Sequence, residues 1–333
     1  APEEAALPAA TVAVGAPPVL VHVILDEHIG IEGLLGDAPE IAGIRETLKA
    51  FYIDRGFLLF GGAYSEHLHT VNSIPQMLNF GEAQPWEPSM RLHAAMSSNA
   101  YFDRLGGEGY RIRVWQTDFL DYCANEAVCR CRTRRAADLS GVADAPLALG
   151  DKARIVLAEF TKLSPIVHRP LTIYYAVVDR SPVQGISPFG AFDAFDELIR
   201  ELPAAAPGSA FFVHELLPHS PYVLDGDCRL LPLSEWKNQW HGPEEERMDA
   251  YFRQISCLNT KLKAVLQAAG PDAIIIFQGD HGTKIATVTP RAALVGEFGD
   301  ADLIGTHSTL FAVRAPGLAA GYDRRPLPVA QIL

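Results

Sequence analysis

The chain has 333 residues, of which 48% are hydrophobic and 20% are charged, a balance that supports a packed core and excludes a wholly disordered protein. Asp and Glu number 40 against 28 Lys and Arg, which leaves a formal charge of -12. This argues against a general nucleic-acid binder, which presents a clustered basic face.

The chain begins with a Pro-containing, small-residue segment and no initiator Met. We expect residues 1–17 to be a flexible leader from a missing N-terminal region, and residues 18–333 to form one domain. No apolar run approaches the ~20 residues of a membrane-spanning helix.

Apolar, β-branched runs alternate along the chain with segments of helical spacing. Strands are predicted over Val19–Leu25, Phe57–Ala63, Tyr110–Trp115, Ser209–Leu217, Asp272–Phe277 and Thr309–Arg314. Helices are predicted over Pro39–Phe51, Ser73–Asn79, Lys152–Lys162, Phe192–Glu201 and Glu244–Ala269. An irregular excursion is predicted near residues 119–150. The alternation favours an α/β fold with one mostly parallel central sheet covered by helices on both faces.

The cysteines are too irregularly spaced for a structural zinc site with paired ligands. Disulfides formed in an oxidising compartment are one interpretation, and reduced buried thiols are the other. The disulfide candidates are Cys123, Cys129, Cys131, Cys228 and Cys257.

Acidic and histidine side chains follow two of the apolar strands. Asp26 and Glu27 end the first, and Asp280-His281-Gly282 follows the strand that ends at Phe277. Ligands bind beyond the carboxyl ends of strands in open α/β sheets, and carboxylate with imidazole suits zinc or manganese. The alternatives are a helix cap at Asp26 and a simple turn at Asp280.

A hydroxyl group precedes the predicted helix in the segment Thr70-Val71-Asn72-Ser73-Ile74-Pro75. The N-terminus of a helix attracts phosphate or sulfate groups, and a nearby metal would turn the hydroxyl of Thr70 into a nucleophile. The alternative is N-capping by Thr70 or Ser73.

Two further histidines lie in loops that adjoin strands. His219 stands between Pro218 and Pro221, and could bind a metal or a substrate oxygen. His307 precedes the last predicted strand. In each case the alternative is a packed loop histidine.

The four motifs occur in the order Asp26, Thr70-x-x-Ser-x-Pro, Pro-His219-x-Pro-Tyr, and Asp280-His281-Gly. In this order the chain resembles the alkaline phosphatase/sulfatase superfamily over roughly residues 18–320. The closest likeness is to the bacterial sulfatase-like branch, which includes phosphoethanolamine and phosphoglycerol transferases. The resemblance implies a three-layer alkaline-phosphatase-like fold.

The resemblance also implies roles for single residues. Asp26, Asp280 and His281 match the ligands of one metal, and Thr70 matches the nucleophile, which also faces that metal. Glu27 matches a second acidic position used by sulfatases. His219, with Ser73 and the more loosely matched His307, would contact the substrate.

The implied cofactor is a divalent metal, with zinc first and manganese or calcium as alternatives. The implied partners are a phospholipid or other phosphate-bearing donor and a glycan or lipid acceptor, with no nucleic acid. We expect a periplasmic domain, anchored to the inner membrane by the missing N-terminal region. In this context a bridge between Cys228 and Cys257 is expected.

Two departures from the family matter. The sulfatase signature Cys/Ser-x-Pro-x-Arg is absent around Thr70, which disfavours an ordinary sulfatase. Thr283-Lys284 follows Asp-His-Gly, where the transferases have Glu-Ser. We predict a metal-dependent phosphotransferase that forms a phospho-threonine intermediate. The alternatives are a phosphodiester, phosphonate or sulfate-ester hydrolase of the superfamily, and a non-catalytic protein that binds an anionic glycan or lipid.

Overall fold

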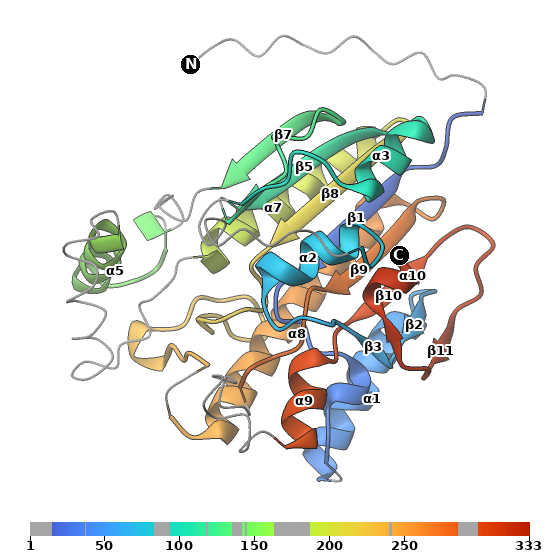
Figure 1. Ribbon diagram of the computed structural model, residues 1–333. Coiled ribbons are helices and arrows are strands. Elements are labelled where there is room, and N and C mark those ends of the chain that lie inside the picture. The colour runs from blue at the N-terminus through green and yellow to red at the C-terminus, as the bar shows by residue number, and fades with distance from the viewer. Residues whose placement is uncertain are drawn as a thin grey trace.

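The computed structural model describes residues 15–36, 38–82, 94–117, 119–134, 142–143, 145–162, 187–239, 242–285 and 299–333. Residues 1–14 of the predicted leader lie outside this range. An eight-stranded sheet in the order β11-β2-β10-β9-β1-β8-β5-β7 forms the centre of the protein (Figure 1).

The strands of the main sheet are β1 (Leu20–Leu25), β2 (Leu58–Phe60), β5 (Arg111–Thr117), β7 (Val128–Arg134), β8 (Ser209–Glu215), β9 (Ile274–Gly279), β10 (Phe311–Arg314) and β11 (Gly321–Asp323). The described α-helices include α1 (Pro39–Ile53), α2 (Thr70–Leu78), α3 (Ala100–Gly107), α5 (Leu149–Lys162), α7 (Ser187–Glu201), α8 (Glu244–Ala269), α9 (Asp300–His307) and α10 (Val329–Ile332). Four short strands, β3 (Ala63–Tyr64), β4 (Ala94–Ala95), β6 (Leu120–Asp121) and β12 (Leu327–Pro328), pair in two small sheets.

The middle of the sheet is parallel. Strand β1 pairs in parallel with β8 on one side and β9 on the other, whereas β10 runs antiparallel to both of its neighbours. All six residues of β1 are buried, as expected for a strand that is covered on both faces. The carboxyl ends of β1, β8 and β9 therefore lie side by side at one edge of the sheet.

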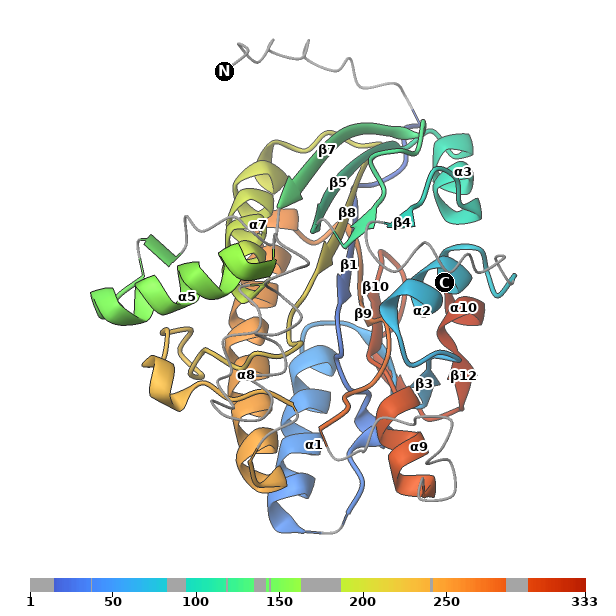
Figure 2. The same ribbon diagram turned by 60° about the vertical axis from the view of Figure 1, so that its left-hand side comes forward.

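Helices cover both faces of the sheet, as Figure 2 shows. One face carries α1, α7 and α8, and their apolar residues form the larger core cluster together with residues such as Val21 and Val23 of β1. The opposite face carries α2, α3 and α10, which pack against Leu20 and Ile24. Alternate residues of β1 serve different cores because successive side chains of a strand point to opposite faces. The predicted three-layer α/β fold is confirmed.

The predicted strand over Phe57–Ala63 is divided into β2 and β3 at Gly61 and Gly62. A Cβ atom at Gly61 would collide with the ring of Tyr322, and one at Gly62 with backbone carbonyls of the C-terminal segment. The two glycines thus let the C-terminal segment cross close to the chain, and that crossing interrupts the strand.

The expectation of an irregular excursion near 119–150 is wrong over part of its length, because β7 forms an edge of the main sheet there. Its arginines alternate along the strand and contact the acidic face of α7. Arg134 pairs with Glu197, and Arg130 pairs with Glu201 at 3.1 Å. An edge strand with a polar face lacks the apolar run from which the other strands were predicted.

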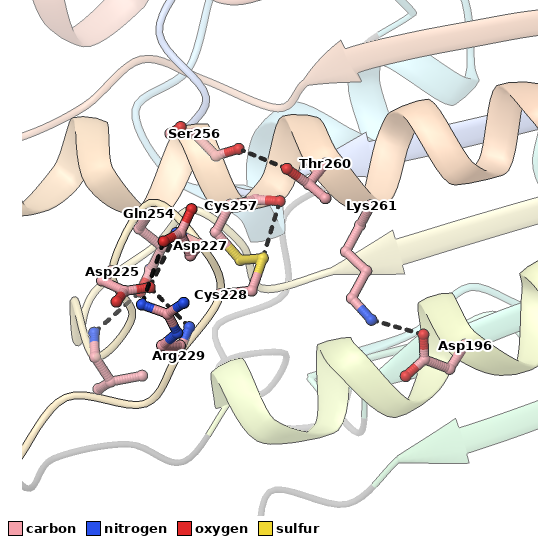
Figure 3. Close-up of a disulfide and its surroundings, with 11 residues drawn as sticks. Asp196, Asp225, Asp227, Cys228, Arg229, Gln254, Ser256, Cys257, Thr260 and Lys261 are labelled. Carbon is pink, nitrogen blue, oxygen red and sulfur yellow. Dashed lines mark hydrogen bonds and ion pairs between the residues drawn. A yellow bond between two sulfur atoms is a disulfide. The ribbon is translucent and has the colours of Figure 1, made fainter.

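Two disulfides join four of the five cysteines: Cys123 to Cys131 and Cys228 to Cys257. Cys129 is exposed and free. The second bridge, drawn in Figure 3, ties the loop that follows β8 to the middle of α8. Within the described residues, none of the helices combines the length and the apolar character needed to cross a membrane.

Candidate functional site

Asp26, Asp280 and His281 meet just beyond the ends of the neighbouring strands β1 and β9. One potential ligand atom from each lies within 4.8 Å of the other two. All three residues are buried, with 3%, 2% and 1% of their surfaces exposed. The parallel pairing of β1 with β9 produces this meeting, because it brings the residues after the two strands to the same edge.

Hydrogen bonds orient two of the three groups, His281 and Asp280. His281 Nδ1 donates to the carbonyl of Gly282 at 2.8 Å, so the lone pair of Nε2 faces Asp280 Oδ2 at 3.3 Å and Asp26 Oδ1 at 3.8 Å. Asp280 Oδ1 accepts hydrogen bonds from two backbone amides, whereas its buried Oδ2 has no hydrogen-bond partner. An imidazole that donates one N–H to a backbone carbonyl and presents its other nitrogen is the usual arrangement of a metal-binding histidine.

The electrostatics of Asp26, Asp280 and His281 favour the binding of a cation among them. Burial, followed by the neighbouring Asp280 carboxylate, raises the pKa of Asp26 well above its usual range. Burial also lowers the pKa of His281, which favours the neutral imidazole. Two buried carboxylates and a neutral nitrogen repel one another through their lone pairs, and a divalent cation among them would relieve that repulsion. The residues therefore fit the divalent metal that the resemblance implies.

Thr70 is the first residue of α2 and lies beside the same group. Its Oγ is 3.5 Å from Asp26 Oδ1 and 3.4 Å from His281 Nε2. Three protein groups and a hydroxyl at a helix N-terminus thus face one point, where the dipole of α2 favours negative charge. This is the environment that an attacking threonine oxygen requires.

Helix α2 begins three residues earlier than predicted, at Thr70 rather than at Ser73. Pro75 consequently lies inside the helix instead of in its first turn. Ser73 is buried, and its hydroxyl has no hydrogen-bond partner, so it does not cap the helix. Proline favours the first turn of a helix, so Pro75 led to a predicted start at Ser73, three residues after the actual start.

His219 lies in the loop after β8, with its side chain 32% exposed. Its Nδ1 lies 2.6 Å from the carbonyl oxygen of Ser220, and its Nε2 lies 3.6 Å from Glu27 Oε1. Both neighbours are hydrogen-bond acceptors, which favours a proton on each ring nitrogen. Burial lowers the pKa of His219, but the carboxylates of Glu27 and Asp26 outweigh it and the net shift is upward.

Helix α8 holds this loop in place. Gln254 is fully buried, and its Nε2 donates to the carbonyls of Pro218 and His219 at 3.1 and 3.2 Å. Its Oε1 accepts from the backbone amide of Val223 at 3.0 Å. The bridge from Cys228 to Cys257 fastens the same loop to α8 one turn further along (Figure 3).

The two remaining predicted residues, Glu27 and His307, lie outside the group of Asp26, Asp280 and His281. Glu27 is fully buried but contacts Lys284, His219 and Gln239 instead. His307 ends α9, and its Nδ1 lies 2.7 Å from the carbonyl oxygen of Ser65. It lines a cavity of about 630 Å³ between α9 and the segment 62–66.

Lys284 and Gln239 were not predicted as site residues. Lys284 is 8% exposed and its Nζ lies 3.1 Å from Glu27 Oε1. The amide of Gln239, turned so that its nitrogen faces Glu27, donates to both carboxylate oxygens at 2.6 and 3.2 Å. The one sequence signal for Lys284 was its place after Asp-His-Gly, where the phosphoethanolamine transferases have Glu-Ser instead of Thr283-Lys284. Nothing in the sequence near Gln239 marks it.

Comparison with solved structures places this architecture in a known class. A protein of the alkaline phosphatase superfamily from Vibrio parahaemolyticus matches with a TM-score of 0.55 and 14% identity, over 96% of this chain and 65% of its own. The C-terminal periplasmic domain of EcEptC from Escherichia coli, in complex with Zn, matches with a TM-score of 0.55 and 12% identity, over 96% and 81%. The lipoteichoic acid synthase LtaP from Listeria monocytogenes matches with a TM-score of 0.53 and 12% identity, over 92% and 67%.

The chain therefore has the fold of the alkaline phosphatase superfamily, and its structural relatives in that superfamily include enzymes. It spans about two thirds of the length of the first of these relatives. No protein-family model matches the sequence, and no curated protein matches it.

Proposed function

We propose that the protein is a metal-dependent phosphotransferase that forms a covalent intermediate on Thr70. The observation that carries this proposal is the position of Thr70 Oγ, at the N-terminus of α2 and within 3.5 Å of both Asp26 and His281. A structural threonine would not need to face two buried metal-ligating groups.

Asp26, Asp280 and His281 would hold the metal, with Thr70 beside it. A bound divalent ion lowers the pKa of a hydroxyl held against it and neutralises charge on the transferring group. Zinc fits two carboxylates and one imidazole, and one structural relative was solved with Zn. Manganese and calcium remain the alternatives.

The side chains of the protein account for the two halves of the reaction. Thr70 loses its hydroxyl proton to solvent, its Oγ attacks phosphorus, and the bond to the leaving oxygen breaks. His219 then gives that oxygen a proton from Nε2, the nitrogen it holds near Glu27. In the second half an acceptor hydroxyl attacks phosphorus and gives its proton to His219, and the bond between phosphorus and Thr70 breaks.

The proposed donor is a phospholipid or another phosphate-bearing molecule of the cell envelope, and the proposed acceptor is a glycan or lipid hydroxyl. The proposal is supported by the Thr-x-x-Ser-x-Pro motif, by the likeness to a periplasmic domain and by the likeness to a lipoteichoic acid synthase. It implies an extracytoplasmic location, with anchoring to the inner membrane by a region that precedes this chain. Two disulfides agree with an oxidising compartment.

The test uses the chain loaded with zinc or manganese, with bis-p-nitrophenyl phosphate and a fluorescent phosphoethanolamine lipid as substrates. Thr70→Ala should retain the metal and lose about 10³-fold or more of the turnover. Thr70→Ser, the matched control, should retain measurable turnover because it keeps a hydroxyl. Mass spectrometry of the quenched reaction should locate the phosphate ester on the peptide that contains Thr70.

Two results would count against the proposal. A chain that binds no divalent metal would leave Asp26 and Asp280 without their role, and full activity of Thr70→Ala would remove the nucleophile. Adding glycan or lipid hydroxyls distinguishes the reactions that Thr70 can support. Transfer predicts labelled acceptor, whereas release of the phosphate to water alone would identify a hydrolase.

A further inference from the structure

Glu27 follows Asp26 directly, yet the two carboxylates have different neighbours: Asp26 lies beside Asp280 and His281, whereas Glu27 pairs with Lys284. Glu27 has a φ of 62°, in the left-handed region that only a strongly held non-glycine residue adopts. Its amide donates to Asp280 Oδ1 at 3.0 Å, and its carbonyl accepts from the hydroxyl of Tyr251 at 2.7 Å. The backbone is thus held by Asp280 after β9 and by Tyr251 of α8 while the chain turns sharply after Asp26.

The carboxylate of Glu27 is surrounded by donors from three other residues. Lys284 Nζ lies at 3.1 Å, the amide nitrogen of Gln239 at 2.6 and 3.2 Å, and His219 Nε2 at 3.6 Å. These donors surround a side chain with no exposed surface. A carboxylate that accepts from several donors in this way has few free lone pairs for a metal.

One metal ion is enough to compensate the buried carboxylates of the site, and the partly exposed His219 adds a further positive charge when both of its ring nitrogens are protonated. Asp26, Glu27 and Asp280 are three buried carboxylates close together. One divalent cation in the group of Asp26, Asp280 and His281 compensates two of them. The ammonium of Lys284, buried against Glu27, compensates the third. Buried charges are tolerated when each has a counter-ion and hydrogen bonds.

We infer that Glu27 is a positioning residue and not a metal ligand: it holds Lys284 as the second cation of the site, so that the protein binds a single divalent ion. This inference rests on the proposed function, since it assumes that a metal binds at Asp26, Asp280 and His281. It departs from the sulfatase-like ligand role that sequence resemblance assigns to Glu27.

The experiment measures metal stoichiometry and affinity rather than turnover. The metal-depleted chain, carrying Cys129→Ser to remove the exposed thiol, is titrated with Mn²⁺ or Zn²⁺ by calorimetry, and the bound metal is counted after gel filtration. We expect one ion per chain. Glu27→Gln should still bind one ion, with a dissociation constant within about threefold of the parent. Asp280→Asn, the matched control, should lose the ion.

Variants at Lys284 test its role as the second cation. Lys284→Arg keeps a positive charge and should bind one ion. In Lys284→Met, Glu27 loses its counter-ion, and a second, weaker equivalent should appear that the additional change Glu27→Gln removes. If Lys284→Met fails to fold, the number of ions bound by Glu27→Gln and by Lys284→Arg still tests whether Glu27 is a ligand.

The outcomes separate this inference from the function beneath it. Two ions bound by the parent chain, or an ion bound more than tenfold more weakly by Glu27→Gln, would make Glu27 a ligand and overturn the inference, while leaving a metal-dependent enzyme. A parent chain that binds no ion would contradict the proposed function itself.

Discussion

At the scale of single residues, the buried histidine of β1 is held by two groups that fix its protonation. His22 of β1 is 1% exposed and lies between Tyr101 and Gln278, at 2.9 Å from each. Gln278 presents its oxygen to Nε2, so this nitrogen carries the proton, and Nδ1 accepts from the hydroxyl of Tyr101. The bond accepted by Nδ1 requires the neutral imidazole, because a protonated Nδ1 has no lone pair to accept with.

This arrangement predicts acid sensitivity. Burial lowers the pKa of His22 from 6.5 to about 4. The unfolded chain takes up a proton below pH 6.5 and the folded chain does not, so the stabilisation from neutral His22 is complete above pH 6.5 and declines as the pH falls toward 4. The decline amounts to about 3 kcal/mol in all, at roughly 1.4 kcal/mol per pH unit.

Urea unfolding of the parent and of His22→Gln between pH 7.5 and pH 4.5 measures this contribution. The glutamine cannot titrate, so the free energy of unfolding of the parent should fall by about 2–3 kcal/mol more than that of the variant. The difference between the two isolates His22 from the other buried histidines. Parallel curves for the two proteins would contradict the prediction.

At the scale of elements, α8 connects the core to the candidate site. One stretch of this helix provides Tyr251 to the backbone of Glu27, Gln254 to the loop of His219, and Cys257 to the disulfide with Cys228. The loop that carries His219 would otherwise be held by few regular hydrogen bonds. The helix therefore sets the direction of His219 as much as the loop does.

The two disulfides should contribute unequally to stability. Cys228 and Cys257 are separated by 29 positions, and Cys123 and Cys131 by 8. A bridge that closes a longer loop removes more entropy from the unfolded chain, about 3.6 kcal/mol for the first and about 2.6 kcal/mol for the second.

Paired alanine variants provide the comparison. Cys228→Ala with Cys257→Ala should lower the free energy of unfolding by about 1 kcal/mol more than Cys123→Ala with Cys131→Ala, as measured by urea denaturation. It should also reduce turnover, because the loop of His219 loses an anchor. A larger loss of stability from the shorter bridge would show that local packing outweighs loop entropy here.

At the scale of the whole molecule, the site lies where the parallel strands β1, β8 and β9 end. Binding of a metal there would connect segments from both ends of the sequence, since Asp26, Thr70 and Asp280 come from different elements. The free energy of binding adds to the stability of the folded chain, because the unfolded chain has no assembled site.

Removing the metal should therefore lower the melting temperature. At a free metal concentration of a hundred times the dissociation constant, the bound ion adds about 2.7 kcal/mol, or roughly 5 °C for a chain of this size. Differential scanning calorimetry with zinc and with EDTA measures the shift. Asp280→Asn should abolish it, whereas Asp227→Asn, which changes an exposed carboxylate, should retain it. An equal shift in both variants would place the metal elsewhere.

The sequence alone was sufficient for the α/β fold, for most of the buried strands, and for the motifs of the candidate site. Apolar, β-branched runs identify strands such as β1 because burial on both faces allows few other residues. The polar groups after β1 and β9 were predicted to lie where ligands bind, beyond the ends of strands, and their role as ligands of one metal was implied by the family resemblance.

Only the tertiary structure decided which way each side chain points and what it contacts. Glu27 faces Lys284 because of a backbone turn at positive φ. A glutamate in the sequence does not predict a positive φ. Gln239 and Tyr251 reach the same residue from segments distant in the sequence. Such contacts depend on how helices and loops pack across the sheet, and that packing is a property of the whole chain rather than of any local pattern.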